Sequence, residues 1–439
     1  MAASLKDMVS AIAPTIPPHL IAPHALTAIN AVAQQFPMTL GTTIGFECPL
    51  SLPLSAVDAN ADFFLRISGT WGQSLLAGQP QPPPVLEQLQ SQPELCPPGF
   101  ACLWDVPTWQ RIRQFAQRWA EPTSLLQKAI NDIWLEFDVV PGASHLPIPS
   151  SFFGVKSPGL PSLDWVSQTA LPMLLGTPLS PQAAATLHRC FAAIPASAKV
   201  FQIGALSGRV ASPSSAPALR LYVQDLRQAQ VPSLLNRLAW SGDGDLLTQL
   251  LARVCPGQAT CSLQLEIQDT LSPVIAIECA FPNRAGWQSA LNRLMITGFC
   301  TPERAQALLA YPGYVRAQDA VAPFPKLLAR WSAQLAPYRE CLLVKRLAYL
   351  KFTYRPGHPL LVKAYMGVSP TWVDARYLDA DKAIAASSPS QESVAIQLCK
   401  DLIQQLDYGE VDVDELFAYQ RSQKSRWLNK ALETMCVGG

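Results

Sequence analysis

One arrangement of short segments recurs about five times along this chain of 439 residues, and it limits the possible folds more than any other feature. Two strand-like runs are joined by a short loop, and amphipathic helical segments follow them. Because the loops within the pairs are short, each pair is expected to form an antiparallel hairpin. The repeating unit is therefore ββαα, and its strand pairs are residues 42–50 with 61–69, 132–140 with 150–156, 198–210 with 216–226, 261–269 with 273–281, and 345–355 with 359–368.

Helical segments separate these strand pairs. Their apolar residues recur at intervals of three and four, and Pro, Ser or Thr stands near the start of several of them. A more charged stretch, residues 391–436, is also expected to be helical. This extension would dock on the rest of the chain, cap one mouth of a barrel formed by the strands, or contact a partner. The clearest of the intervening helical segments are residues 108–120, 180–194, 231–240, 286–296 and 301–311.

The two faces of the expected strands differ in character. In LLVKAYMGV, residues 360–368, the alternation of strand side chains puts Lys363 and Tyr365 on one face and Val362, Ala364 and Met366 on the other. The same pattern, one apolar face and one face with isolated polar residues, recurs in every pair. The polar positions are Glu47, Arg66, Glu136, Asp138, Lys156, Gln202, Arg220, Tyr222, Gln264, Glu266, Glu278, Tyr349, Lys351, Lys363 and Tyr365.

A closed sheet explains this pattern best. Helices would pack on the apolar outer face, and closure would remove exposed strand edges. A barrel of ten strands is wider than one of eight, which side chains just fill, so it should enclose a lumen suited to a small molecule or peptide. We therefore predict an α+β chain, a single domain over residues 1–439, with a ten-stranded antiparallel barrel over approximately residues 25–370 and helices around it.

Composition excludes several classes of partner. The formal net charge is +1 and only 15% of the residues are charged, so nothing indicates binding to nucleic acid or to an anionic membrane surface. No apolar run reaches the roughly 18–20 residues that span a bilayer, and the first residues lack the features of a signal peptide. A cytoplasmic location is expected.

The cysteine, histidine and acidic residues give no metal motif. The 5 histidines and 11 cysteines show no paired ligand spacing, and no nucleotide-binding glycine motif or GxSxG sequence occurs. Cys96 with Cys102, and Cys255 with Cys261, could each close a small disulfide loop, although reduced thiols fit a cytosolic chain better. The acidic run around Asp243 fits a helix start better than a metal site, as does the run at residues 412–415.

In its topology and strand-borne residues, the chain resembles the prenyltransferase barrel, or ABBA fold, of aromatic and peptide prenyltransferases. The resemblance covers roughly residues 25–370 and includes no diagnostic signature. It implies a transferase that moves an isoprenoid group from a prenyl diphosphate to an aromatic small molecule or a peptide side chain. The prenyl diphosphate would be a co-substrate, no cofactor would be required, and magnesium is possible but not indicated.

The resemblance also implies roles for individual residues. Glu47 would be the catalytic carboxylate beside the aromatic nucleophile. The cations would stabilise the charge that develops on the diphosphate as the carbon–oxygen bond breaks, and the tyrosines would shield the allyl cation from water. The diphosphate-binding residues would be Arg66, Arg220, Lys351 and Lys363, and the shielding residues Tyr222, Tyr349 and Tyr365.

Two alternatives remain open at the level of sequence. Carboxylates share the expected lumen with the cations, and if the two pair, the lumen would suit a zwitterionic or cationic ligand such as a peptide. The chain would then be a peptide-tailoring or peptide-binding protein that uses the same barrel without prenyl diphosphate. The third possibility is a non-catalytic binding or scaffolding protein, for example an assembly of two smaller α+β domains that never closes. Donor length, acceptor identity and oligomeric state are not predicted.

Overall fold

A computed structural model describes residues 3–41, 43–50, 59–79, 97–143, 145–156, 163–209, 216–254, 260–335 and 339–374. The expected helical extension at 391–436 lies outside these residues, as do Cys96, Cys255 and the acidic run at 412–415. Among the described helices, none is long and apolar enough to cross a membrane.

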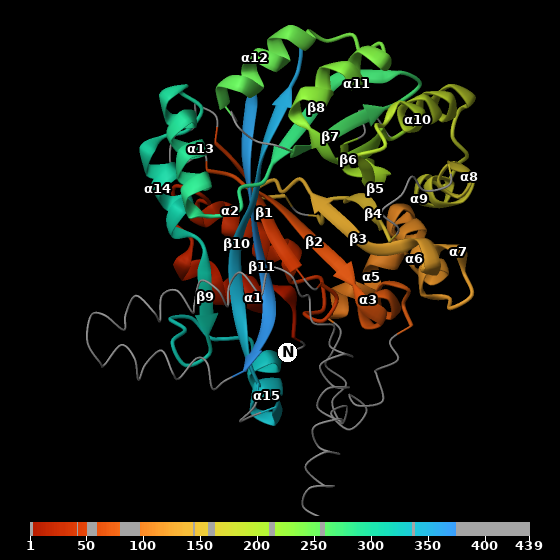
Figure 1. The fold of residues 1–439 in the computed structure, drawn as a ribbon. Coiled ribbons are helices and arrows are strands. Elements are labelled where there is room, and N and C mark those ends of the chain that lie inside the picture. Colours follow the sequence, from red (N-terminus) through yellow and green to blue (C-terminus); the bar gives the residue numbers. More distant parts are fainter. Residues whose placement is uncertain are drawn as a thin grey trace, which may run out of the picture.

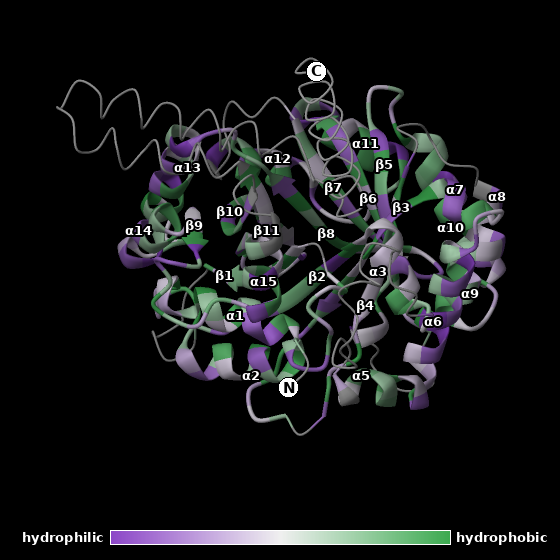
Figure 2. Ribbon diagram, turned by 90° about the horizontal axis from the view of Figure 1, so that it is seen from below, coloured by the Kyte–Doolittle hydropathy of each residue, from purple (hydrophilic) through white to green (hydrophobic). Residues whose placement is uncertain are grey.

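Ten antiparallel strands close into a barrel (Figures 1 and 2). Each strand pairs with its neighbour in the order β1-β2-β3-β4-β5-β6-β7-β8-β10-β11, and β11 pairs back onto β1. This confirms the predicted barrel, and the alternative of two separate sheets is wrong. The strands are β1 Thr43–Pro49, β2 Asp62–Ser68, β3 Ile130–Phe137, β4 Ser150–Val155, β5 Lys199–Ala205, β6 Leu219–Arg227, β7 Thr260–Ile267, β8 Leu271–Cys279, β10 Arg339–Tyr354 and β11 Leu361–Asp374.

Helices surround the barrel, as Figures 1 and 2 show. Several begin where the sequence predicted: Ser180 and Thr301 each accept a hydrogen bond from a backbone N–H of the first turn, and Pro occupies the first position of both helices. The helices are α1 Leu5–Ile12, α2 Pro23–Ala33, α3 Gly69–Leu76, α5 Pro98–Cys102, α6 Pro107–Ala120, α7 Leu125–Ala129, α8 Leu163–Trp165, α9 Leu171–Leu175, α10 Pro181–Ala193, α11 Val231–Arg237, α12 Gly244–Val254, α13 Arg284–Ile296, α14 Pro302–Ala310 and α15 Lys326–Leu335, with one turn of π-helix, η4, at Val166–Ala170.

The main hydrophobic core lies between the outer face of the barrel and these helices. Val362, Ala364 and Met366 of β11 are fully buried in it, which confirms the predicted orientation of that strand. Burial of a side chain the size of valine or methionine contributes roughly 1.5–3 kcal/mol. Apart from Lys345 in the outer part of β10, which packs against Tyr311, the buried residues of this outer face are mainly apolar, so most polar residues of the barrel strands point into the lumen.

The last hairpin is longer than predicted. The sequence indicated strands at 345–355 and 359–368, whereas β10 has 16 residues and β11 has 14. The outer part of β10 pairs on its other side with a short strand, β9 (Gly313–Arg316), that was not predicted from the sequence. A register shift between Leu347 and Tyr349 separates this outer part from the part within the barrel. Because the alternation of side chains changes phase at this shift, a strict alternation traced from the barrel part of β10 does not continue to its start at Arg339.

Candidate active site in the barrel lumen

Most of the polar strand residues point into the lumen, as the alternation predicted. On β6, for example, Leu219, Leu221 and Val223 belong to the outer core, whereas Arg220 and Tyr222 face inward. Lys156 is an exception. It follows the end of β4, its side chain is exposed, and its ammonium donates to the backbone carbonyl of Gln127 in α7, so it does not reach the lumen.

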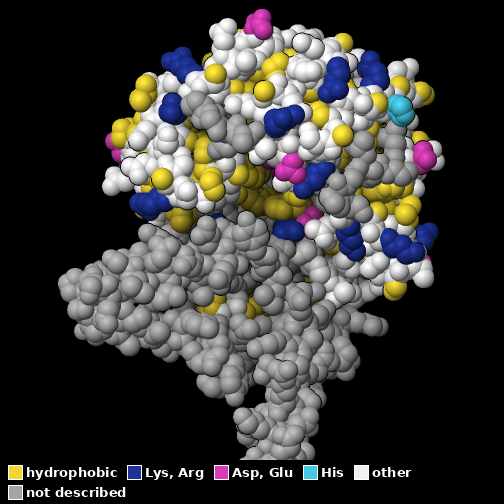
Figure 3. Space-filling view, in the orientation of Figure 1, with side chains coloured by type: hydrophobic (Ala, Val, Ile, Leu, Met, Phe, Trp, Pro, Cys, Tyr) yellow, Lys and Arg dark blue, Asp and Glu magenta, His cyan; other side chains and the backbone are white. Residues whose placement is uncertain are grey.

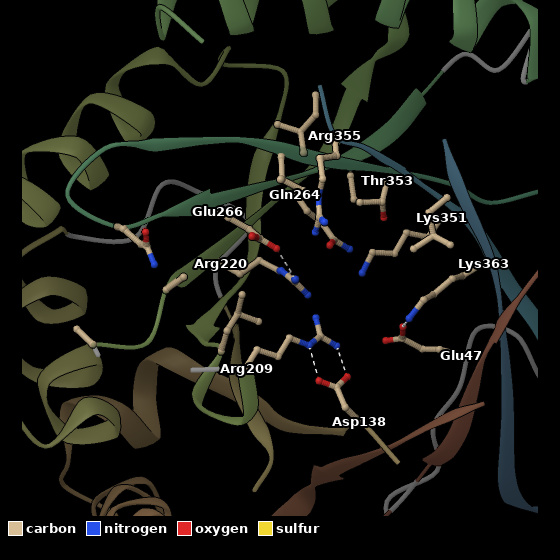
Figure 4. Close-up of a pocket in the computed structure, with 18 residues that line it drawn as sticks. Glu47, Asp138, Arg209, Arg220, Gln264, Glu266, Lys351, Thr353, Arg355 and Lys363 are labelled. Carbon is tan, nitrogen blue, oxygen red and sulfur yellow. Dashed lines mark hydrogen bonds and ion pairs between the residues drawn. The ribbon is translucent and has the colours of Figure 1, made fainter. Parts of the chain in front are cut away.

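A cavity of about 520 Å³ opens at one end of the lumen. In Figure 3 the molecule has a hollow whose wall is largely hydrophobic, with a few basic and acidic side chains at its edge. Five cations and three carboxylates line the cavity, and in Figure 4 several of them point toward its middle. The cations are Arg209, Arg220, Lys351, Arg355 and Lys363, and the carboxylates are Glu47, Asp138 and Glu266.

Lys363 joins two carboxylates from neighbouring strands. Its ammonium lies 2.9 Å from Glu47 Oε2 and 3.0 Å from Asp62 Oδ2. Burial alone would raise the pKa of Glu47, but the ammonium of Lys363, with help from Lys351 and Arg209, holds it well below its usual value. Burial would likewise lower the pKa of Lys363, and the two carboxylates raise it instead. Glu47 is therefore a carboxylate at neutral pH, suited to accept a hydrogen bond and weak as a base.

Arg220 keeps two unused donors although it is almost fully buried. Its Nη2 donates to Glu266 Oε1 at 2.6 Å, while its Nη1 lies 3.7 Å from Glu136 Oε2, too far for a hydrogen bond. Nε and Nη1 of Arg220 and Oε2 of Glu136 have no hydrogen-bond partner among the described residues. An unpaired buried donor costs roughly 1–3 kcal/mol, so this guanidinium is prepared to bind an acceptor atom.

Lys351 and Arg355 are the cavity cations without a carboxylate partner among the described residues. Lys351 Nζ donates to the hydroxyl of Tyr365 at 3.1 Å and lies 5.5 Å from the centroid of the same ring. Burial, and then the nearby charge of Arg220, lower the pKa of Lys351. Arg355 is exposed at the edge of the cavity. Neither cation therefore forms an ion pair with a described side chain, although Lys351 lies near the carboxyl groups of Glu47, Glu136 and Glu278.

An aromatic cluster lies against the polar side chains. The rings of Tyr349 and Tyr365 stack with centroids 4.3 Å apart, and Phe64 connects Tyr365 to Trp134 through centroid distances of 5.9 and 5.7 Å. Phe152 meets Tyr222 edge-on at 5.5 Å, and the hydroxyl of Tyr222 points at Glu136. Burial raises the pKa of Tyr222, Tyr349 and Tyr365 well above the usual value, so all three stay neutral phenols.

The structure brings together most of the residues predicted from the sequence. Glu47, Arg220, Lys351 and Lys363 line one cavity, and the three tyrosines lie beside these residues without lining it. Arg66 is separate. It binds Asp132 at 2.6–2.7 Å, lies over the ring of Trp134, and is not part of the cavity wall.

Three charged residues of the site were not singled out from the sequence. Arg355 and Asp62 each lie four residues from Lys351 and Arg66, respectively, and follow the same alternation, so that signal was available. Arg209 lies beyond β5 in a short 3-10 turn, Ser207–Arg209, where strand alternation no longer applies. It forms a bidentate pair with Asp138 at 2.6–2.7 Å.

Two interpretations made from the sequence concern other residues. Asp243 accepts a hydrogen bond from the backbone N–H of Leu246 at the start of α12, which confirms a helix cap. Within the described residues, no His, Cys, Asp and Glu side chains gather so that they could hold a metal ion. Cys261 is a free, buried thiol that donates to the carbonyl of Leu226, and Cys255 lies outside the described residues.

Among known proteins, the chain is similar to solved structures only. No protein-family model and no curated protein matches the sequence. Solved structures of aromatic prenyltransferases align with most of the chain. The apo form of prenyltransferase PriB is 13% identical to this chain with a TM-score of 0.45, and the alignment covers 83% of this chain and 94% of PriB. The 5-dimethylallyltryptophan synthase from Streptomyces coelicolor is also 13% identical with a TM-score of 0.45, and its alignment covers 83% of this chain and 97% of the synthase. A 6-dimethylallyl tryptophan synthase is 12% identical with a TM-score of 0.46, covering 84% of this chain and 99% of that one. Likeness at this level does not establish a shared activity.

Proposed function

We propose that this barrel transfers an isoprenoid group from a prenyl diphosphate to an aromatic acceptor, either a small molecule or a peptide side chain. The observation that carries the proposal is that five cations line the cavity wall and that not all of them are paired. Lys351 and Arg355 have no described carboxylate partner, and Arg220 has two free N–H donors. A diphosphate bears about three negative charges and several acceptor oxygens, which such a set of donors suits.

The aromatic cluster supports the same reaction. As the carbon–oxygen bond of the donor breaks, its electron pair leaves with the diphosphate, and the prenyl carbon becomes an allyl cation. The faces of Tyr349 and Tyr365 would stabilise this cation by roughly 0.5–2 kcal/mol and exclude water from it. The aromatic acceptor then forms the new bond to the prenyl carbon and afterwards gives up a proton, which the released diphosphate would take up. Glu47, held as a carboxylate by Lys363, would orient the acceptor through a hydrogen bond.

A second candidate function has its own support. Four cations of the lumen already have a carboxylate within 3 Å: Arg66 pairs with Asp132, Arg209 with Asp138, Arg220 with Glu266, and Lys363 with Glu47 and Asp62. A lumen of paired charges favours a zwitterionic ligand, such as a peptide, over a polyanion. In this case the protein would bind or modify peptides without a prenyl diphosphate.

Thermal shift measurements distinguish the two functions. Dimethylallyl, geranyl and farnesyl diphosphates would be compared with inorganic diphosphate and with peptides that contain tryptophan or tyrosine. We expect the diphosphates to raise the melting temperature of the wild type and to do so much less in Lys351→Met. The matched control is Lys128→Met, which removes an exposed lysine of α7 on the outside. If peptides stabilise the protein and no diphosphate does, prenyl transfer is wrong and the second function stands.

Mass spectrometry then identifies the reaction. The protein would be incubated with a stabilising prenyl diphosphate and with tryptophan, or with peptides that contain tryptophan or tyrosine. A product heavier by one isoprenoid group, together with released diphosphate, is the expected result. If the diphosphate binds and no such product forms, the protein is a binding protein and not a prenyltransferase.

A further inference from the structure

Glu278 lies directly opposite Lys351 where β8 pairs with β10. Its Oε1 accepts a hydrogen bond from the side-chain amide of Gln264, a residue of the cavity wall. Neither Glu278 nor Lys351 forms an ion pair with another described residue, although both side chains are more than nine-tenths buried. One carboxyl and one ammonium group thus face each other across a strand pair next to the cavity, each with a neutral hydrogen-bond partner.

The surroundings of Glu278 do not provide enough positive charge to keep it ionised. Burial raises the pKa of Glu278 to about 7; the ammonium of Lys351 opposes this rise, whereas the carboxylates of Glu136 and Glu47 add to it. Lys351 in turn is shared, since it also faces Glu47 and Glu136. The ionisable and polar groups near Glu278 are Glu47 on β1, Glu136 on β3, Arg220 and Tyr222 on β6, Gln264 on β7, Lys351 and Tyr349 on β10, and Lys363 and Tyr365 on β11.

We propose that the cavity binds its anion together with a proton, and that Glu278 is the residue that takes up this proton. The proposal rests on the proposed function, because the anion is the diphosphate of a prenyl donor. An anion that approaches Lys351 and Arg220 adds negative charge beside Glu278 and favours its neutral form. A neutral Glu278 no longer competes for Lys351, whose charge is then available to the anion. Glu278 thereby acts on the diphosphate through Lys351, as a positioning residue.

Calorimetry tests this coupling directly. Inorganic diphosphate would be titrated into the entire chain at pH 7 in PIPES and in Tris, two buffers with very different heats of ionisation. The difference in heat gives the number of protons exchanged on binding. We expect the wild type to take up about 0.3–0.5 more protons per diphosphate than Glu278→Gln, as follows for a group that is half protonated before binding. Subtracting the proton count of Glu278→Gln from that of the wild type removes the protons that diphosphate itself exchanges.

The variants are chosen to leave the rest of the molecule unchanged. The side chain introduced by Glu278→Gln keeps an oxygen that can accept the hydrogen bond from Gln264. Glu303→Gln, which alters an exposed carboxylate at the start of α14, should behave as the wild type.

If diphosphate gives no binding heat with the wild type, the proposed function fails. If diphosphate binds and the proton count is the same in wild type and Glu278→Gln, the coupling is wrong. Should Glu278→Gln not fold, infrared difference spectra of the wild type decide: a protonated carboxyl band must grow on binding, and its absence overturns the inference.

Discussion

Lys351 directs its ammonium at the hydroxyl of Tyr365, 3.1 Å away, and not at a carboxylate. Lys363, two residues before Tyr365 on β11, has the opposite arrangement, with two carboxylates within 3.0 Å. The two lysines were assigned the same role from the sequence. Their partners now separate them: Lys351 has no described carboxylate within ion-pair distance, whereas Lys363 would have to share its charge with Glu47 and Asp62.

Replacement of Lys351 with methionine should weaken the binding of inorganic diphosphate by about 10–100-fold, which corresponds to roughly 1.5–3 kcal/mol for a charge-assisted hydrogen bond. Methionine keeps the length of the side chain, and the burial that lowers the pKa of Lys351 shows that its charge is costly in the free protein. Thermal stability should therefore not fall. Isothermal titration calorimetry measures the affinity, with Lys128→Met as control. An unchanged affinity would exclude Lys351 from the site.

Replacement of Lys363 with methionine should mainly reduce stability. The change leaves Glu47, which is almost fully buried, and Asp62 close together without their common cation. Breaking a buried ion pair in this way costs about 3–5 kcal/mol, and the partial exposure of Lys363 and Asp62 favours the lower end of that range. Urea denaturation should show the loss, and the double variant Lys363→Met with Glu47→Gln should recover part of it. Equal stability of the single and double variants would argue against a buried charge as the cause.

The stability of the wild type should depend on Glu278 as pH rises. The folded-state pKa of about 7 lies above the usual 4.5, so the folded protein binds this proton more tightly than the unfolded chain does. The resulting contribution is fully present below about pH 4.5 and is lost as the pH rises through about 7. Relative to Glu278→Gln, the wild type should therefore lose on the order of 2–3 kcal/mol between pH 5 and 8. Parallel urea curves for the two proteins across this range would contradict the assignment.

Replacement of Tyr349 with leucine should increase the share of donor that is lost to water. Without this ring, which stacks on Tyr365, the allyl cation loses roughly 0.5–2 kcal/mol of stabilisation and part of its shield. We expect transfer to slow by about 2–30-fold and the ratio of prenyl alcohol to transferred product to rise. Liquid chromatography quantifies both. Tyr354→Leu removes a tyrosine of the same strand that faces outward onto Trp240; it should change the melting temperature and not the ratio.

Alternation along single strands predicted the fold well because both faces of the barrel are chemically distinct. Val362, Ala364 and Met366 could be assigned to the helix side, and Lys363 and Tyr365 to the lumen, from LLVKAYMGV alone. The same alternation could not predict the length of β10, because a register shift changes its phase at Leu347. β9 has only four residues, too few to show a pattern.

The residues that form the site were predicted better than the ion pairs between them. Which face a residue occupies follows from its own strand, but which charge it meets depends on distances across the lumen. Glu136 on β3 lies near Arg220 on β6, and no property of either segment indicates this contact. Arg66 has the same residue type and alternation as the others, yet Asp132 on the adjacent strand binds it away from the cavity.

The register shift between Leu347 and Tyr349 also decides which residues of the last hairpin can take part in chemistry. On the outer side of the shift, Lys345 packs against Tyr311 and donates to Thr15, whereas beyond it Tyr349 and Lys351 face the lumen. In a regular strand Lys345 and Lys351, six positions apart, would share one face. The extra residue Ala348, between the pairs Leu347–Met366 and Tyr349–Tyr365, reverses the phase between them. If all these residues alternated without the shift, either the buried Lys345 or the lumen residues would have to turn to the opposite face. One extra residue in β10 thus keeps Lys345, which packs on the outside of the barrel, and Lys351, which faces the lumen, on opposite faces.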